Sequence, residues 1–171
     1  GVVKDTANFL AIDGPHEARL TEAGICLKMG IPTGYKKLGK DNFWIDTGSP
    51  HYVRFVEQPL DQMDVHQEGH NIRNSPPYAE KGTNVNFAKF SNDGLNVRTY
   101  ERGVEAETWS CGTGVTAVAE VYARQNAITK KAIQISTPGG NLQVHISEGE
   151  APWLEGPATF VFKGNIEGPK K

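Results

Sequence analysis

Hydrophobic and polar residues alternate with period two along much of the chain, which is the pattern of strands with one buried face. Glycine, proline and asparagine interrupt the alternation at short intervals, as turns do. The alternating or apolar segments that predict strands are 8–12, 17–21, 25–29, 42–47, 51–56, 83–90, 95–101, 132–136, 142–146 and 158–163. The Asn92-Asp93-Gly94 sequence predicts a hairpin between two of them. Segment 31–41 is polar and predicts a loop, and 59–82 leaves room for at most one short helix, near 64–71.

One segment has a helical pattern instead. Residues 112–126 are apolar around most of the circumference, with a stripe of Val115, Val118, Ala119 and Tyr122. Only Thr116, Glu120, Arg124 and Gln125 are expected to need water. Such a helix is typically buried, so the pattern predicts an α+β fold. We expect a strongly curved, mostly antiparallel sheet, a partial barrel, wrapped around this one central helix.

The composition argues against nucleic-acid-binding and membrane proteins. The chain has 171 residues, 22% of them charged, and a net charge of −2, which argues against a nucleic-acid partner. No apolar run approaches the roughly 20 residues that span a bilayer, so no membrane partner is expected. Two cysteines, Cys26 and Cys111, at no metal-like spacing favour a reducing cytoplasm. Cys26 lies within an expected strand and is interpreted as a buried structural residue.

The strongest chemical candidate is Cys111, which stands just before the expected helix. Backbone N–H groups are unpaired at a helix N-terminus and favour negative charge, so this position predicts a thiol prepared to ionise. The N–H groups of Gly112, Thr113 and Gly114 would form an anion site suited to a carboxylate. The alternative interpretation of Cys111 is a small residue that only caps the helix.

Other polar residues stand at strand ends. Glu101 could accept a thiol proton and Arg102 could clamp a substrate carboxylate, although a solvated ion pair is the simpler interpretation. His51 enters a strand after a Gly-Ser-Pro turn, where a structural role is also plausible. Asn84 and Asn86 share one face of a strand, and at least one is expected to point at a polar site. The remaining histidines, His16, His66, His70 and His145, form no recognisable cluster, and no metal is expected.

These residues form a pattern that resembles a known family. Segments 99–103, 107–108 and 111–114, preceded by 48–51 and Asn84, resemble the second half of diaminopimelate epimerase. Segments 138–142 and 156–164 are similar to the C-terminus of the same family. The resemblance covers essentially the whole chain. It implies an amino-acid epimerase without a cofactor, built from two pseudo-symmetric domains, with one cysteine from each domain on opposite sides of the substrate α-carbon.

The resemblance also implies roles for individual residues. Cys111 would be one of the two acid/base thiols, Glu101 its proton-accepting partner, and His51 an assistant to the cysteine of the other domain. The N–H groups of Gly112 and Thr113 would hold the α-carboxylate of the substrate, diaminopimelate. The distal amino-acid end would be recognised by Arg102 and Asn84, together with Ser49, which replaces the usual asparagine of the family.

The chain lacks a second Cys-Gly-Asn-Gly motif, so we expect it to correspond to the C-terminal part of an epimerase. Residues 1–30 would end the N-terminal domain or form boundary strands, and 31–156 would form the domain with the catalytic cysteine. Residues 157–171 would form a C-terminal strand and tail that return to the missing N-terminal domain. Alone, the chain is expected to be inactive, and a homodimer is expected of the complete protein. Two alternatives stay open: another isomerase of this fold, proline-racemase-like or phenazine-biosynthesis-like, and a non-catalytic binding domain.

Overall fold

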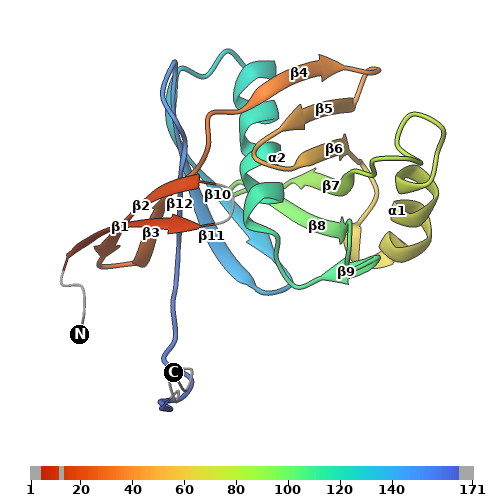
Figure 1. Cartoon of the computed structure of the whole chain (residues 1–171). Coiled ribbons are helices and arrows are strands. Elements are labelled where there is room, and N and C mark those ends of the chain that lie inside the picture. Colours follow the sequence, from red (N-terminus) through yellow and green to blue (C-terminus); the bar gives the residue numbers. More distant parts are fainter. Residues whose placement is uncertain (1–4, 12–13, 166–171) are drawn as a thin grey trace.

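The computed structural model describes residues 5–11 and 14–165, which form one mixed sheet and two α-helices (Figure 1). The strands run along the sheet in the order β1-β2-β3-β12-β11-β10-β8-β7-β6-β5-β4, and β9 pairs with β8. Their bounds are β1 Thr6–Ala11, β2 Gly14–Thr21, β3 Gly24–Lys28, β4 Thr33–Lys37, β5 Asn42–Asp46, β6 Pro50–Phe55, β7 Asn84–Phe90, β8 Leu95–Glu101, β9 Ala106–Thr108, β10 Lys130–Thr137, β11 Gly140–Ser147 and β12 Trp153–Gly156. The helices are α1 Val65–Arg73, α2 Gly112–Gln125 and the short 3₁₀ helix η1 Leu60–Gln62.

The pairing is mostly antiparallel, as predicted, with parallel pairs at β6–β7 and β8–β10. The β8–β10 pair is short, because only Leu95 with Ile135 and Asn96 with Ser136 are in register. This seam divides the strand order into two arms, one from β4 to β8 and one from β10 through β12 to β1. The sheet is open, since the end strands β1 and β4 do not pair with each other.

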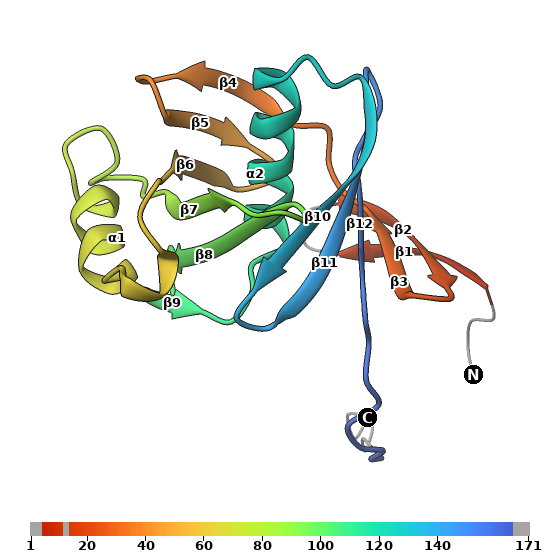
Figure 2. The ribbon, with the colours of Figure 1, turned by 180° about the vertical axis from the view of Figure 1, so that it is seen from behind.

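Helix α2 is buried between the two arms. It contacts β5, β6, β7 and β8 of one arm and β11 of the other, an arrangement visible in Figures 1 and 2. The predicted polar face of α2 differs in the structure, because Thr116 and Glu120 are buried. The Thr116 hydroxyl donates to the Gly112 carbonyl at 2.9 Å, and Glu120 lies 3.4 Å from Arg124. Bonds within the helix thus take the place of the expected water.

Helix α1 covers a second, smaller core that contains Val65, Val85 and Tyr100. The helix begins where predicted, with the Asp64 side chain accepting from the Gln67 N–H at 2.9 Å. Gly69 is required by the packing, since a Cβ there would lie 2.3 Å from the Tyr100 Cβ. Neither described helix is both long and apolar enough to cross a membrane.

Several sequence predictions are wrong. Segment 31–41 contains strand β4, and the segment between the predicted strand 95–101 and Cys111, where no strand was predicted, contains strand β9. The predicted strand 158–163 has no regular structure and projects from the sheet (Figure 1). Its apolar side chains are exposed. The strand that enters the sheet is instead β12, just before it, which pairs with β11 and β3. Positions 12–13 of the first predicted strand and turn, and 166–171 of the expected tail, lie outside the described residues.

Candidate active site

Cys111 is the N-cap residue of α2. Its backbone is extended, and its carbonyl accepts the first helical hydrogen bond, from the Val115 N–H at 2.9 Å. The side chain is 8% exposed, and its Sγ lies 3.5 Å from the Thr113 Oγ1. The sequence therefore placed the thiol correctly at the start of a buried helix.

The electrostatics of Cys111 differ from the prediction. Burial raises the pKa of the thiol above its ordinary value, and the nearby Glu101 carboxylate raises this pKa further. Hydrogen bonds from the Thr113 hydroxyl and from the N–H groups of Gly114 and Thr113 act in the opposite direction on the same pKa. Desolvation is the largest effect, so without a ligand the resting form is the thiol. The N–H groups favour the thiolate, but they do not outweigh burial.

Glu101 ends strand β8 beside this thiol. Its Oε2 accepts a hydrogen bond from the Thr108 hydroxyl at 2.9 Å, across the β8–β9 pair that the sequence did not predict. The carboxylate is partly exposed and close enough to affect Cys111 electrostatically. Thr108 thus orients the group that was predicted to accept a proton.

His51 lies fully buried in β6, in contact with the two asparagines of β7. The Asn86 amide nitrogen donates to the His51 Nδ1 at 3.0 Å and to the Tyr52 carbonyl at 3.0 Å, while the Asn86 carbonyl accepts from Thr99. These partners fix the amide orientation and place the imidazole proton on Nε2. Burial, with a smaller effect of the Arg102 charge, lowers the pKa of His51 to about 3, so the ring is neutral.

Asn84 is hydrogen-bonded to Ser49 and Arg102, which were also predicted to bind substrate. Its amide nitrogen donates to the Ser49 hydroxyl at 2.8 Å and to the Pro50 carbonyl at 3.2 Å, and its carbonyl accepts from the Arg102 N–H at 2.9 Å. The Arg102 side chain is exposed and donates to the Lys81 carbonyl at 3.0 Å. The structure therefore brings these predicted site residues together with His51.

Two contacts connect this cluster to the start of α2. The Thr47 hydroxyl, before the Gly-Ser-Pro turn, donates to the Thr113 carbonyl at 2.9 Å. Gly114 faces Asn86 so closely that a Cβ would lie 2.4 Å from the Asn86 Oδ1. Residues from β6, β7, β8 and α2 thus form one site around Cys111. No role was predicted for Thr47 or Thr108. Thr108 lies in segment 107–108, which resembles the family, whereas the only signal for Thr47 is a hydroxyl beside a Gly-Ser-Pro turn.

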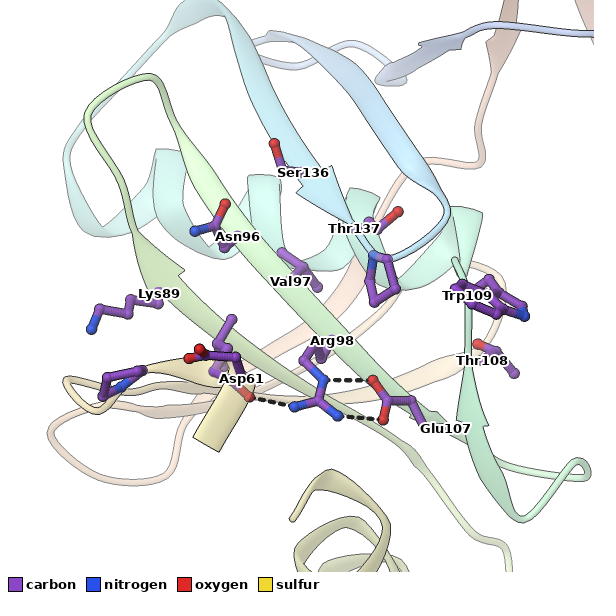
Figure 3. A pocket seen from close by; sticks show the side chains of 13 residues that line it. Asp61, Lys89, Asn96, Val97, Arg98, Glu107, Thr108, Trp109, Ser136 and Thr137 are labelled. Carbon is purple, nitrogen blue, oxygen red and sulfur yellow. Dashed lines mark hydrogen bonds and ion pairs between the residues drawn. The ribbon is translucent and has the colours of Figure 1, made fainter. Parts of the chain in front are cut away.

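A separate cavity lies beside β8 and β10. This cavity of about 910 Å³ opens where β8 and β10 part, near η1 and Trp109 (Figure 3). Two of its charged groups pair with each other: Arg98 makes two hydrogen bonds of 2.6 Å to Glu107 and further bonds to the carbonyls of Leu60 and Met63. Cys111 is not among its lining residues. We therefore assign the candidate chemistry to the Cys111 site and not to this cavity.

Comparison with known proteins identifies the family. The diaminopimelate epimerase family model matches residues 43–161, which include all the site residues described above. The chain belongs to the diaminopimelate epimerase family. It is 38% identical to the diaminopimelate epimerase of Flavobacterium psychrophilum over 96% of this chain and 66% of that protein. It is 39% identical to that of Chlorobaculum tepidum, over 92% of this chain and 64% of that protein. The chain thus spans slightly less than two thirds of the length of these relatives.

Solved structures share the fold at low sequence identity. A putative phenazine biosynthesis PhzC/PhzF protein from Clostridium difficile matches 96% of this chain and 66% of its own, with a TM-score of 0.66 and 12% identity. A hydroxyproline epimerase from Agrobacterium vitis matches 87% of this chain and 55% of its own, with a TM-score of 0.65 and 11% identity. These two likenesses establish the epimerase/PhzF fold and carry no information about substrate.

Proposed function

We propose that this chain supplies one half of a diaminopimelate epimerase, an isomerase of lysine biosynthesis that converts LL-diaminopimelate to meso-diaminopimelate in the cytoplasm. The observation that carries the proposal is the position of Cys111 at the N-terminus of α2, beside Glu101 and next to the cluster of Ser49, His51, Asn84 and Arg102. The curved sheet would form a partial barrel around α2, which holds the thiol at the mouth of the site.

In the proposed reaction, one thiolate breaks the α-carbon–hydrogen bond and takes the proton, leaving the electron pair on carbon. The opposite thiol then gives a proton to the other face of that carbon, so atoms and charge balance without a cofactor. Cys111 performs one of these steps, with Glu101 accepting the Cys111 proton when the thiolate forms. The second thiol belongs to the missing N-terminal domain.

Substrate binding would use the start of α2. The N–H groups of Gly112 and Thr113 would hold the α-carboxylate and stabilise the charge that develops beside it. Ser49, Asn84 and Arg102 would bind the distal amino-acid end. His51, neutral with its proton on Nε2, would donate a hydrogen bond to the thiolate of the opposite domain.

The test is hydrogen exchange at the α-carbon of LL-diaminopimelate in D₂O, followed by mass spectrometry and chiral separation. We expect the 171-residue chain alone to give no inversion, and its co-expression with an epimerase N-terminal domain that contains the second cysteine to restore it. C111S should abolish the restored activity, whereas C26S, which removes the other thiol, should retain it. Full activity of C111S, or stereoinversion by the chain alone, would contradict the proposal.

A further inference from the structure

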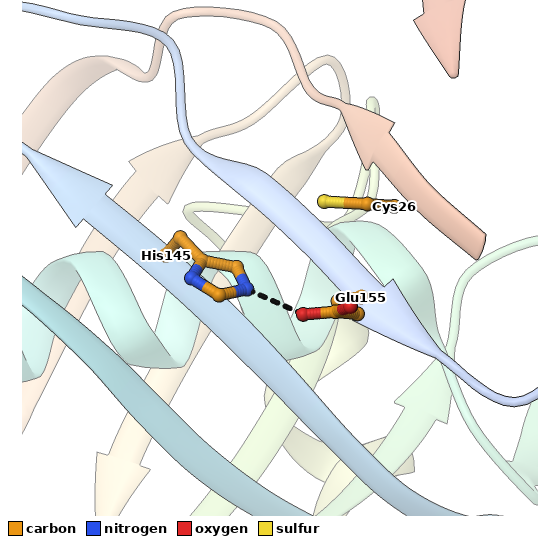
Figure 4. Close-up of side chains that lie close together, drawn as sticks. All are labelled: Cys26, His145 and Glu155. Atoms are coloured by element: carbon orange, nitrogen blue, oxygen red, sulfur yellow. Dashed lines mark hydrogen bonds and ion pairs between the residues drawn. The ribbon is translucent and has the colours of Figure 1, made fainter. Parts of the chain in front are cut away.

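A second cluster of reactive side chains lies on strands β3, β12 and β11 of the sheet. Cys26 of β3 stands directly opposite Glu155 of β12, and Glu155 stands opposite Gln143 of β11. His145, two residues further along β11, projects from the same face of the sheet. Figure 4 shows Cys26, His145 and Glu155 together, one from each of three neighbouring strands.

The donor atoms of these three residues lie within 4.8 Å of one another. The His145 Nε2 is 2.7 Å from the Glu155 Oε2, and the second carboxylate oxygen, Oε1, accepts from the Thr21 hydroxyl at 2.6 Å. Zinc binds thiolate sulfur at about 2.3 Å and imidazole or carboxylate donors at about 2.0–2.2 Å, which brings tetrahedral donor pairs to about 3.3–3.8 Å. Side-chain rotations that move the donors by about 1 Å would meet that geometry.

We propose that Cys26, His145 and Glu155 form a binding site for Zn²⁺, with Sγ, Nε2 and Oε2 as ligands and water as the fourth. One thiolate and one carboxylate balance the two charges of the ion. On binding, the Cys26 proton leaves to solvent and the imidazole proton moves to Nδ1. The His145 side chain is 39% exposed and Glu155 14%, so the ion can enter from solvent and keep a water ligand.

The surroundings of the cluster favour a bound cation. The nearby cations are already paired: Arg19 lies 2.7 Å from Glu17, and Lys28 lies 3.6 Å from the same carboxylate. Thr21 fixes the carboxylate in the way that outer-shell partners orient metal ligands.

Co²⁺ is a suitable probe, because thiolate ligation gives it a charge-transfer band and tetrahedral coordination gives it intense visible absorption. We expect the reduced full chain to bind one Co²⁺ saturably, Zn²⁺ to displace it, and the affinity to rise with pH as Cys26 gives up its proton. C26S should remove the charge-transfer band. C111S, the matched cysteine variant, should keep it.

Further variants distinguish metal binding by Cys26, His145 and Glu155 from metal binding by other side chains. T21V keeps all three ligands and should weaken Co²⁺ binding by about 10-fold or more through the loss of carboxylate orientation, while H145Q should abolish tetrahedral binding. His66 and His70 stack one turn apart on α1 and could hold a metal by themselves, so the H66Q/H70Q double variant serves as a control that should bind as the parent does. Absence of saturable binding, a charge-transfer band retained in C26S, or binding lost in H66Q/H70Q would overturn the proposal.

Discussion

At the scale of single residues, Cys111 is subject to two opposing effects. The start of a helix favours a thiolate, whereas burial and the neighbouring Glu101 favour a thiol, and burial has the larger effect on the pKa. The sequence position of Cys111 predicts the effect of the helix start, but it gives no information about burial. A cysteine at the N-terminus of an exposed helix would be more reactive, whereas burial keeps Cys111 in the thiol form.

The first prediction concerns the ionisation of Cys111. In a C26S background, E101Q should lower the pKa of Cys111 by removing a negative neighbour, and T113V should raise it by removing a hydrogen-bond donor. Rates of iodoacetamide alkylation measured against pH should therefore shift in opposite directions in the two variants. A shift in the same direction for both would contradict this account of the thiol.

His51 provides a prediction about stability and pH. Its pKa of about 3 in the folded chain lies below the ordinary 6.5, so between these pH values the unfolded chain binds a proton that the folded chain does not. The stability gained from a neutral His51 is complete above pH 6.5 and is lost as pH falls toward 3. The loss is on the order of 5 kcal/mol, at about 1.4 kcal/mol per pKa unit over about 3.5 units.

Urea unfolding of the parent and of H51Q between pH 4 and 7.5 measures this contribution. Removal of the imidazole should flatten the dependence of the unfolding free energy on pH in that window. An equal dependence of the unfolding free energy on pH in H51Q and in the parent would show that His51 has the same pKa in the folded and unfolded chains.

Individual site residues show which parts of the candidate site could be predicted from the sequence. Cys111, Glu101 and Asn84 were found because their residue types are unusual at a helix start or a strand end, or inside a strand. The partners that orient them, Thr47 and Thr108, are ordinary hydroxyl residues. Their importance depends on which strands pair, and the β8–β9 pair was not visible in a three-residue segment. Desolvation, which reverses the expected pKa of Cys111, likewise depends on packing.

At the scale of elements, α2 approaches β7 at Gly114. A Cβ at this position would lie 2.4 Å from the Asn86 Oδ1 and 3.2 Å from the Cys111 Cβ. The Asn86 side chain cannot yield easily, because it is bonded to His51, Tyr52 and Thr99. The close approach of the helix to the strand therefore depends on glycine.

We predict that G114A destabilises the chain by about 1–3 kcal/mol, the usual effect of overpacking, although alanine favours helices. G112A is the matched control in the same turn, since its Cβ would meet only the flexible end of Leu154, at 3.1 Å. Chemical unfolding of both variants gives the comparison. Equal stability of G114A and G112A would show that Asn86 can move aside.

The mistaken elements have a common physical cause. Segment 158–163 alternates well enough for a strand, but β12, which precedes it, already fills the position between β3 and β11, and none of the described strands pairs with 158–163. Segment 33–37 has few apolar residues, yet pairing with β5 makes it an edge strand, where one-sided pairing and polar side chains suffice. A period-two pattern indicates that one face of a segment is buried. It does not indicate which neighbouring strand the segment pairs with.

At the scale of the whole molecule, the segment after β12 adds little to the described core. Phe160, Val161 and Phe162 are at least 80% exposed. We predict that deletion of residues 158–171 changes the unfolding free energy of the chain by less than about 0.5 kcal/mol, the range of ordinary surface changes.

The deletion should also reduce binding of the dye 8-anilinonaphthalene-1-sulfonate, because it removes an exposed apolar run. L154A is the contrasting variant: Leu154 of β12 packs against the main core, and its truncation should cost about 2 kcal/mol or more. Thermal and chemical unfolding of the two variants measures the difference. A deletion as destabilising as L154A would mean that the segment packs on the core in solution.

The seam between β8 and β10 has a consequence for how the molecule opens. Two residue pairs form the backbone connection between the arms within the described sheet, and the rest of their cohesion comes from side chains packed on α2. Native-state hydrogen exchange should therefore detect two cooperative units, β4–β8 and β10–β12 with β1–β3, with separate opening energies. Cys111 belongs to the helix that joins them, while the cysteine of the candidate zinc site belongs to the second arm. Protection of the α2 amides would thus report how tightly the two units are coupled.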